Sequence, residues 1–590
     1  MGELQDHATT GRGAEDHASS AHDQSFLRKY VFSTDHKIIG IQYGVTALVF
    51  LLIGFFLVLL MRWQLAYPEQ AVPALGDLFG DRMPAGVMSP EFYNQLGAMH
   101  GTIMVFLGVV PLAVGAFGNY LIPLQVGAPD MAFPKLNMAS YWLYVAGGLI
   151  MLGSFFLPEG SARAGWTSYP PLAVLEPGGQ TWWLLGMVLL INSSLLGSVN
   201  IIVTIVQLRA PGLHFMRMPF LVWAQLVTAF LLLLAFPPLE VAGFMQLLDR
   251  VAGTSFFMPT GLVIDGQAFS GSGGGNALLW QHLFWFLAHP EVYVLILPAM
   301  GIVAEVITNN TRKPLWGYKT MIYALLFLGG MSFIVWAHHM FLTGMGTTIS
   351  TFFQLTTMII SVPSIIILTA LIISLWGGSI RFTTPMLFAL AFIPMFGIGG
   401  LTGLPLGLSV ADVHLHDTYY VIAHFHFVVA PGTLMALFAG IYHWYPKVTG
   451  RRMNDLLGRL HFWPTLIGLN GVFLPMFLVG MAGVSRRLYD GGRTYAHAQD
   501  VLWLNQVSTV ASWLLAAAQV FFVINFFRSL RSGKKVDDNP WQGTTLEWAT
   551  TSPPLGHGNF AAPVSVHRGP YEYSVPGASE DFSPQHREGI

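Results

Sequence analysis

Six histidines lie inside or at the ends of the most apolar stretches of this 590-residue chain. They are His100, His289, His338, His339, His424 and His426. One buried histidine is more often a hydrogen-bonded core residue than a ligand. Six are hard to explain that way, because each would need its own polar partner in an apolar environment. The six histidines therefore point to bound metals or a metal-containing cofactor.

The spacing of these histidines indicates how they could bind metals. His424 and His426 point about 200° apart on a helix, so one helix offers an imidazole on each of two faces. His338 and His339 are adjacent in a second stretch, and His289 lies in a third. Since the chain has no cysteine, three imidazoles from two segments favour a copper site.

Three further residues extend this pattern. Tyr293 follows His289 at i+4 and shares its helix face, with Glu291 between them. His100, in a separate apolar stretch, is placed to give a haem its second axial ligand. The residues thus suggest redox chemistry at a buried centre.

The elements that must position these residues are membrane-spanning helices. The chain is 53% hydrophobic and 10% charged, whereas an average soluble protein has about 25% charged residues. Twelve apolar runs are long enough to cross a bilayer, for which about 20 residues suffice. They cover residues 38–61, 97–123, 138–158, 182–207, 219–249, 277–306, 318–340, 350–377, 383–407, 418–444, 459–482 and 505–530.

The fold class predicted is an all-α integral membrane protein, a twelve-transmembrane-helix bundle over residues 31–530. Residues 1–30 are predicted to be a disordered N-terminal tail, and residues 531–590 a C-terminal tail. With the N-terminus in the cytoplasm, every loop lysine lies on that side, and the positive-inside rule then places both tails there. The opposite side receives only Arg62, Arg82, Arg163, Arg250, Arg486, Arg487 and Arg493. A net charge of −2 with scattered basic residues argues against binding of nucleic acid.

Several motifs resemble the haem–copper oxidase superfamily, specifically the subunit I family of the cytochrome c oxidases. They are His289-Pro-Glu-Val-Tyr293, Trp336-Ala-His-His339, the run from His416 to His426, Gly127-Ala-Pro-Asp130 with Met131-Ala-Phe-Pro134, and the pair Arg486-Arg487. The resemblance covers residues 30–530 and implies the twelve-helix haem–copper oxidase bundle.

The resemblance implies a role for each candidate residue. His100 and His426 would be axial ligands of a low-spin haem, His424 the proximal ligand of a high-spin haem, and His289, His338 and His339 the copper ligands. Tyr293 looks like the tyrosine that family members cross-link to the copper-bound histidine, and it would supply an electron and a proton when the O–O bond breaks. Arg486 and Arg487 would pair with haem propionates. His416 and Asp417 resemble ligands of a magnesium ion.

Two of the implied roles compete with simpler alternatives. Arg62 resembles an arginine at the edge of the low-spin haem, but it could instead reach the membrane interface. Trp166 resembles a tryptophan over the active site, although tryptophans are also common in interfacial belts. His282 is expected to be structural.

Protons must cross apolar protein to reach such a centre. The family uses an aspartate and asparagines, here Asp130, Asn119 and Asn137, to open a water-filled channel toward a glutamate, here Glu291. Desolvation favours the neutral form of a buried carboxyl group, which suits a proton shuttle.

A second channel of the family has no counterpart at its central position. Its lysine is replaced by Ile367, with Ser364 at the place of the neighbouring threonine, and Ala304 replaces a serine. An aliphatic side chain cannot relay a proton. One hypothesis is that Glu305 and Ser364, with bound water, form a replacement.

The resemblance favours reduction of dioxygen to water with electrons from cytochrome c, coupled to proton translocation, in a bacterial inner membrane. It implies two haems of a type, one copper, and partner subunits: a subunit II with a dinuclear copper centre and a subunit III. Quinol remains open as donor, since Gln95 matches quinol oxidases whereas Phe92 stands where they carry a histidine. Nitric oxide reductase is the alternative within the superfamily, because it does not need the second channel. A haem-free proton-coupled transporter is the alternative of another class.

Overall fold

The computed structural model of the chain describes residues 25–588 except 74, 77, 270, 272 and 557. Within these residues, twelve helical segments are long and apolar enough to cross a membrane, which confirms the predicted fold class. They are α2 (His36–Ala66), α3 to α4 (Pro90–Val126), α5 with η6 (Pro134–Phe156), α7 (Gly179–Gln207), α8 (Phe220–Val251), α9 (Ala277–Thr311), α10 with η8 (Tyr318–Thr343), α11 (Gly346–Leu375), α12 (Thr384–Leu406), α14 to α15 (Tyr419–Thr449), α16 (Asp455–Met481) and α17 (Leu504–Ser532).

Four of these segments change helix type along their length. The parts are α3 (Pro90–Thr102), η4 (Ile103–Val109), η5 (Pro111–Ala116) and α4 (Phe117–Val126); α5 (Pro134–Gly153) and η6 (Ser154–Phe156); α10 (Tyr318–Ser332) and η8 (Trp336–Thr343); α14 (Tyr419–Val428), η9 (Val429–Leu434) and α15 (Met435–Thr449). η4, η5 and η9 are π-helical. Such π-helical turns within α-helices are frequent at functional sites.

Short elements connect the spans or lie before the first and after the last of them. They are η1 (Leu27–Val31), η2 (Gly80–Arg82), η3 (Pro84–Gly86), α6 (Leu172–Leu175), η7 (Phe215–Arg217), α13 (Ser409–Leu415), η10 (Ala496–Val501) and η11 (Leu546–Ala549), with the antiparallel pairs β1 (Val263–Ile264) with β2 (Gln267–Ala268) and β3 (Arg451–Arg452) with β4 (Lys534–Lys535).

The second span begins seven residues before the apolar run that predicts it. Ser89 is its N-cap, and the Ser89 hydroxyl accepts the N–H of Phe92 at 3.2 Å. Pro90 occupies the first helical position, where its missing N–H is not needed. Capping and proline chemistry therefore extend the helix beyond the apolar stretch.

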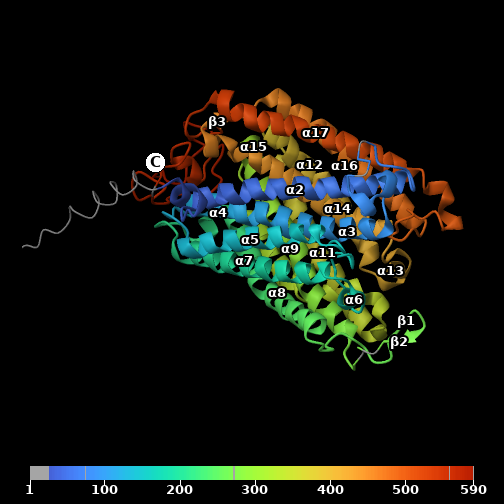
Figure 1. Cartoon of the computed structure of the whole chain (residues 1–590). Helices are drawn as coiled ribbons and strands as arrows, with labels where there is room; N and C mark the ends of the chain where they lie inside the picture. The colour runs from blue at the N-terminus through green and yellow to red at the C-terminus, as the bar shows by residue number, and fades with distance from the viewer. Residues whose placement is uncertain are drawn as a thin grey trace, which may run out of the picture.

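α9 is the most buried of the twelve spans and lies inside the bundle. Figure 1 shows α8 below it and α12, α16 and α17 above it. It packs along α8 and also contacts α15, α12 and η8. Side chains on α9 can therefore meet groups from several neighbouring helices.

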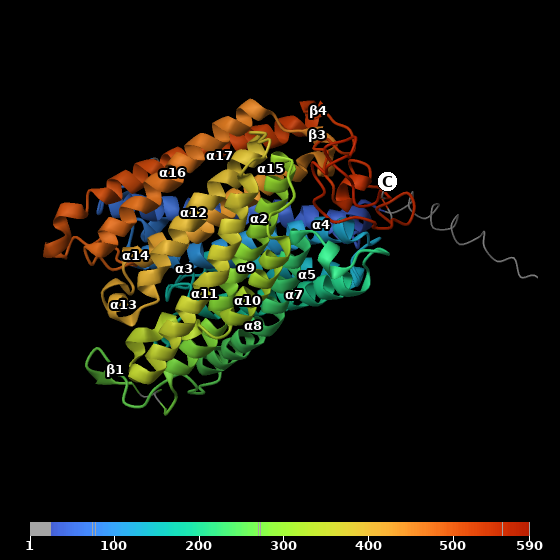
Figure 2. The same cartoon turned by 180° about the vertical axis from the view of Figure 1, so that it is seen from behind.

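Residues 533–588, called here the C-terminal segment, are folded against one end of the bundle, where Figures 1 and 2 show them gathered. Trp541, Trp548 and Tyr573 of this segment are buried. Arg312, at the end of α9, forms an ion pair with Asp581 at 2.7 Å. The prediction of a C-terminal tail over 531–590 is corrected in this respect, because non-local packing without helical periodicity leaves no pattern in the sequence.

The N-terminal tail predicted over residues 1–30 can be followed only in part. Residues 1–24 lie outside the described residues, and residues 25–30 lead into η1. Lys37, at the start of α2, donates a hydrogen bond to Asn559 at 2.9 Å. The start of the first span and the C-terminal segment therefore lie at the same end of the bundle.

Candidate metal centre and proton route

Three histidines converge from two elements, as the sequence predicts. His289 of α9 and His338 and His339 of η8 each place a ring nitrogen within 4.8 Å of the others. Nδ1 of His289 lies 3.2 Å from Nε2 of His339, and Nε2 of His289 is buried without a hydrogen-bond partner among the described residues. Imidazole nitrogens aimed at one another in a dry interior fit a bound copper ion.

Neighbouring side chains hold these imidazoles in place. Nδ1 of His338 lies 2.8 Å from the Thr357 hydroxyl of α11, and the Trp285 ring stacks on His339 at 3.8 Å. Such outer contacts orient ligands and fix their tautomers. Thr357 could not be predicted as a histidine partner, because a threonine on an apolar helix gives no signal of this role in the sequence.

Tyr293 and Glu291 lie on α9, within four residues of the predicted copper ligand His289. The Tyr293 ring centroid is 4.9 Å from that of His289, as the i,i+4 spacing predicts. Glu291 is 2% exposed, and neither carboxylate oxygen has a partner among the described residues. A buried carboxyl group without protein partners is suited to receive and release protons through water.

The three predicted haem ligands share one hydrogen-bonding pattern. Nδ1 of His100, His424 and His426 lies 2.8 Å from the carbonyl oxygens of Gly54, Gly399 and Ile422 respectively. Because donation to a carbonyl places the proton on Nδ1, Nε2 becomes the free lone-pair donor of each ring. The donor set therefore fits axial ligation of haem iron.

The two histidines of α14 also face different partners. His426 interacts electrostatically with His100, and His424 with His338 of the copper cluster. This arrangement agrees with the 200° separation expected from the sequence. One face of α14 is directed toward His100 and the other toward the copper-binding histidines.

The fit of His424 depends on a glycine of α12. A Cβ atom added to Gly403 would lie 2.6 Å from Cε1 of His424, whereas one added to Gly400 meets nothing within 4 Å. We expect Gly403→Ala to displace the His424 imidazole. Either the content of the haem predicted at His424 or the turnover should then fall by about ten- to a hundredfold. Gly400→Ala is the control and should resemble the wild type. An unchanged carbon monoxide spectrum in Gly403→Ala would contradict this placement.

Arg62 is 3% exposed, so the alternative that it reaches the membrane interface is wrong. Its Nη2 donates to the Asn505 carbonyl at 2.7 Å, while Nη1 is buried without a partner among the described residues. A free guanidinium nitrogen in a dry interior fits a polar substituent at the edge of a haem.

The arginine pair and Trp166 lie near the histidine clusters. Arg486 forms an ion pair with Asp417 at 2.5 Å, and Arg487 Nη2 donates to Thr167 at 3.4 Å. Burial, and then the neighbouring Arg486, lower the pKa of Arg487 to about 10.

Trp166 packs against Trp285, the residue that stacks on His339. Trp166 therefore belongs to the aromatic layer over the copper ligands rather than to an interfacial belt.

The predicted magnesium ligands His416 and Asp417 have an acidic neighbour, Asp412, that was not among the predicted site residues. Nδ1 of His416 lies 3.3 Å from Asp412, and Nε2 lies 3.9 Å from Asp417. Burial acts to raise the pKa of Asp417, but Arg486 and His416 outweigh it and hold that pKa below its ordinary value. Asp412 is one helical turn before His416, so its i,i+4 spacing was the available signal.

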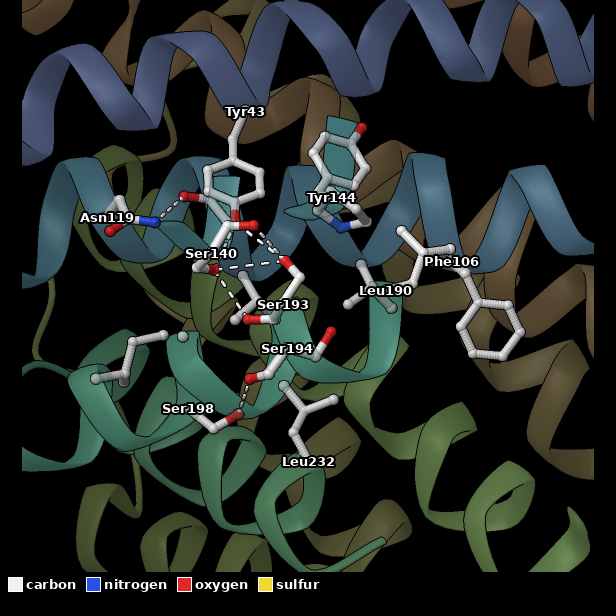
Figure 3. Close-up of a pocket in the computed structure, with 16 residues that line it drawn as sticks. Tyr43, Phe106, Asn119, Ser140, Tyr144, Leu190, Ser193, Ser194, Ser198 and Leu232 are labelled. Carbon is white, nitrogen blue, oxygen red and sulfur yellow. Dashed lines mark hydrogen bonds between the residues drawn. The ribbon is translucent and has the colours of Figure 1, made fainter. Parts of the chain in front are cut away.

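The predicted proton route contains more polar groups than the sequence indicates. Asn119 and Asn137 are buried, and Asn119 Oδ1 and Asn137 Nδ2 lack partners in the described part of the chain. Figure 3 shows Asn119 at a cavity of about 50 Å³ that is also lined by Tyr43, Ser140 and Ser193. The Tyr43 and Ser140 hydroxyls lie 2.7 Å apart. Serine is common in helices, so only the three-dimensional arrangement identifies this hydroxyl chain.

Asp130 lies in the loop between α4, which carries Asn119, and α5, which carries Asn137 and Ser140. Its carboxylate accepts the N–H of Met131 at 2.6 Å. Burial raises the pKa of Asp130 to about 6, although the bond from Met131 acts in the opposite direction. The group can therefore exchange protons near neutral pH.

Ile367, at the position of the lysine in the family's second channel, is fully buried, so an aliphatic side chain fills this place. Ser364 lies on α11, whereas the Glu305 carboxylate accepts bonds from Tyr571 at 2.5 Å and from the N–H of Leu221 at 3.4 Å. No hydrogen bond joins Glu305 to Ser364 among the described residues. The structure therefore directs Glu305 toward α8 and the C-terminal segment.

Twelve spans around a cluster of three histidines, with three further buried histidines in reach of it, are the arrangement expected of a membrane-embedded haem–copper oxidase. Residues 38–514 match the family "Cytochrome C and Quinol oxidase polypeptide I", and the chain belongs to this family as a catalytic subunit. The family membership excludes the alternative of a haem-free transporter.

Known relatives support the same assignment. The chain is 46% identical to "Alternative cytochrome c oxidase subunit 1" of Bradyrhizobium diazoefficiens, covering 96% of this chain and 94% of the relative. It is 42% identical to "Cytochrome c oxidase subunit 1" of Thermostichus vulcanus, covering 95% of each. A cryo-EM structure of a heme-copper terminal oxidase dimer resembles it with a TM-score of 0.68 at 21% identity, covering 85% and 84% of the two chains, which supports the fold.

Proposed function

We propose that the oxidase takes electrons from cytochrome c and reduces dioxygen to water, coupled to proton translocation. The observation that carries the proposal is the cluster of His289, His338 and His339 beside Tyr293, with His424 facing it. When bound, haem iron and copper supply the electrons that reduce dioxygen. The residues of this chain hold those groups, exclude water and deliver protons.

Each histidine has one role in this proposal. His100 and His426 hold the low-spin haem that receives electrons, and His424 holds the high-spin haem opposite the copper ligands. Tyr293 contributes a proton and an electron from the face it shares with His289. The buried Nη1 of Arg62 supports haem of a type, because a polar ring substituent would give this nitrogen its missing partner.

A magnesium ion is proposed at His416 and Asp417, with Asp412 as a further oxygen ligand. Magnesium prefers carboxylate oxygen atoms and retained water, and the two carboxylates flank His416. Arg486 and Arg487 would then lie between this ion and the haem propionates. The site would connect the electron-accepting side of the protein to the haems.

Asp130 is proposed to take up protons from the cytoplasm and pass them by way of Asn119, Asn137 and the hydroxyl chain toward Glu291. We expect Asp130→Asn to lower turnover by about ten- to a hundredfold. Because the pKa of Asp130 is about 6, the carboxylate is free to accept protons above pH 6 and already protonated below it. The loss should therefore be larger at pH 8 than at pH 5, as measured by oxygen uptake across pH. An equal loss at both pH values would contradict this role.

The complex is proposed to contain a subunit II with a dinuclear copper centre, because this chain has no cysteine to form one, and a subunit III. We place it in a bacterial inner membrane with both termini in the cytoplasm, as the lysine distribution supports.

The donor is tested by giving the purified complex either reduced cytochrome c or a quinol and recording oxygen uptake. We expect uptake with cytochrome c alone. Uptake with quinol but not with cytochrome c would overturn this part of the proposal.

A further inference from the structure

A buried acidic site lies where the C-terminal segment meets the bundle. Glu305, near the end of α9, is 6% exposed, and Glu547 of η11 is 1% exposed. Glu305 lies twelve residues beyond Tyr293, or about 18 Å along the helix. Neither carboxyl group forms an ion pair among the described residues.

The two carboxyl groups are close enough to repel one another when both are ionised. Burial also disfavours their charged forms. The buried Lys447 attracts Glu547 without forming an ion pair with it, and Glu305 has no such partner among the described residues. Two such groups titrate as a pair and retain a proton between them more readily than isolated carboxyl groups. The site is therefore chemically able to store a proton.

Tyr571 connects Glu305 to the C-terminal segment. Its hydroxyl donates to Glu305 Oε1 at 2.5 Å, and its oxygen accepts the N–H of Phe220, the first residue of α8, at 2.6 Å. The amide of Phe220 cannot replace the proton that Tyr571 passes to the carboxylate, but the phenol oxygen has a second lone pair, which can take up a proton from water. The C-terminal segment thus provides a proton-carrying side chain as well as a cover.

Glu547 is held by side chains of two other helices. Its Oε1 accepts from Gln125 at 3.0 Å and from Trp444 at 3.3 Å, while its Oε2 is buried without a partner among the described residues. A cavity of about 270 Å³ begins two residues further on, at Ala549 and Thr550. A cavity of this size can hold several water molecules, so water can gather close to Glu547 in sequence, although Glu547 itself does not line the cavity.

A polar track continues inward from Glu305 along α8. Leu221 donates to Glu305, and Gln225 and Thr228 follow at i+4 and i+7 on the same helix face. Both are fully buried, and Gln225 Oε1 and Thr228 Oγ1 lack partners within the described residues. Buried polar atoms of this kind are usually bound by internal water. The track covers about 10 Å of the distance from Glu305 toward the metal centre.

We propose that Glu305, Glu547 and Tyr571 form a second site of proton uptake, which serves the metal centre in place of the route in which Ile367 replaces the lysine. The inference rests on the proposed oxidase function. Water on the side of the C-terminal segment gives a proton to Glu547 or to Tyr571, which passes its own hydroxyl proton to Glu305. Glu305 releases its proton to internal water at Gln225 and Thr228 and is then reprotonated, so that no electron moves in this step.

The test uses the whole purified complex with Glu305→Gln, Glu547→Gln, Tyr571→Phe and the control Tyr573→Phe. Tyr573 is a buried tyrosine of the same segment whose hydroxyl accepts from Asn309 at 3.1 Å. The readouts are the rate of high-spin haem reduction after rapid mixing with reductant, and the infrared difference spectrum between oxidised and reduced enzyme. Haem content checks assembly of each variant.

We expect Glu305→Gln to slow reduction of the high-spin haem by about tenfold or more, with the low-spin haem unaffected. It should also remove an infrared band of a protonated carboxyl group. Glu547→Gln and Tyr571→Phe should slow the reduction less, and Tyr573→Phe should match the wild type. If Glu305→Gln fails to assemble, Tyr571→Phe and Glu547→Gln decide the question, because neither alters α9.

Wild-type rates in Glu305→Gln and Glu547→Gln, with oxygen uptake intact, would overturn this inference and leave the proposed function standing. An equal loss in Tyr571→Phe and Tyr573→Phe would also overturn it, because anchoring of the segment would then explain both. If the unaltered complex fails to consume oxygen, the proposed function itself fails.

Discussion

Replacing His338 with leucine should remove copper from the complex and lower oxygen uptake by more than about a hundredfold. Loss of a residue that only orients a metal ligand costs up to about a hundredfold, and loss of the ligand itself should cost more. His338 lies within the cluster whose ring nitrogens are all less than 4.8 Å apart. Two remaining imidazoles cannot complete the site, and leucine offers no substitute ligand. Metal analysis and oxygen uptake of the purified variant provide the measurement.

His282→Asn is the matched control for this experiment. His282 lies on α9, as His289 does, but accepts a hydrogen bond from Trp336 at 3.3 Å and stands outside the three-histidine cluster. It should keep its copper and most of its activity. Full copper content in His338→Leu would show that the ion binds elsewhere.

Glu291→Gln should lower turnover by about a hundredfold to ten-thousandfold, the usual contribution of a positioned proton-transfer group. Glutamine preserves the shape of the side chain but cannot carry the proton. The two haem spectra should remain as in the wild type, because Glu291 bonds to none of the haem-binding histidines in the described structure. Oxygen uptake and optical spectra of the same preparation provide the measurement.

Near-normal turnover in Glu291→Gln would mean that protons reach the centre without this carboxyl group. Asp130→Asn serves as the comparison, since it lies at the opposite end of the same proposed route. If both act on one route, the double variant should lose little more than Glu291→Gln alone.

The spans and the directions of the candidate ligand side chains could be predicted from the sequence because both depend on local spacing. A membrane span requires a long apolar run, and His424 and His426 face opposite sides of α14 simply because of the helical repeat. The i,i+4 relation likewise places Tyr293 beside His289. These relations need no knowledge of neighbouring helices.

Contacts between distant segments could not be predicted in this way. The bond of Tyr571 to Glu305 joins residues 266 positions apart, and the C-terminal segment has no periodicity that would indicate its packing. Thr357 and Ser140 are ordinary helix residues until the bundle brings them to His338 and Tyr43. For the same reason, the pairing of Glu305 with Ser364 was a reasonable hypothesis from sequence, whereas the structure turns Glu305 toward Tyr571.

Reduction of nitric oxide remains the reaction to compare with reduction of dioxygen, because Ile367 stands where the second channel of the family has its lysine. The presence of Tyr293 beside His289 favours oxygen chemistry. The proton uptake proposed at Glu305 would not need this lysine, so its absence is compatible with oxygen reduction.

The most direct test offers dioxygen and nitric oxide separately to the purified, reduced complex while its optical spectrum is recorded. We predict rapid oxygen uptake, two haem signals of which one binds carbon monoxide, and slow consumption of nitric oxide. Rapid nitric oxide turnover with sluggish oxygen uptake, or a haem-free spectrum of assembled protein, would contradict the assignment of a dioxygen-reducing haem–copper centre.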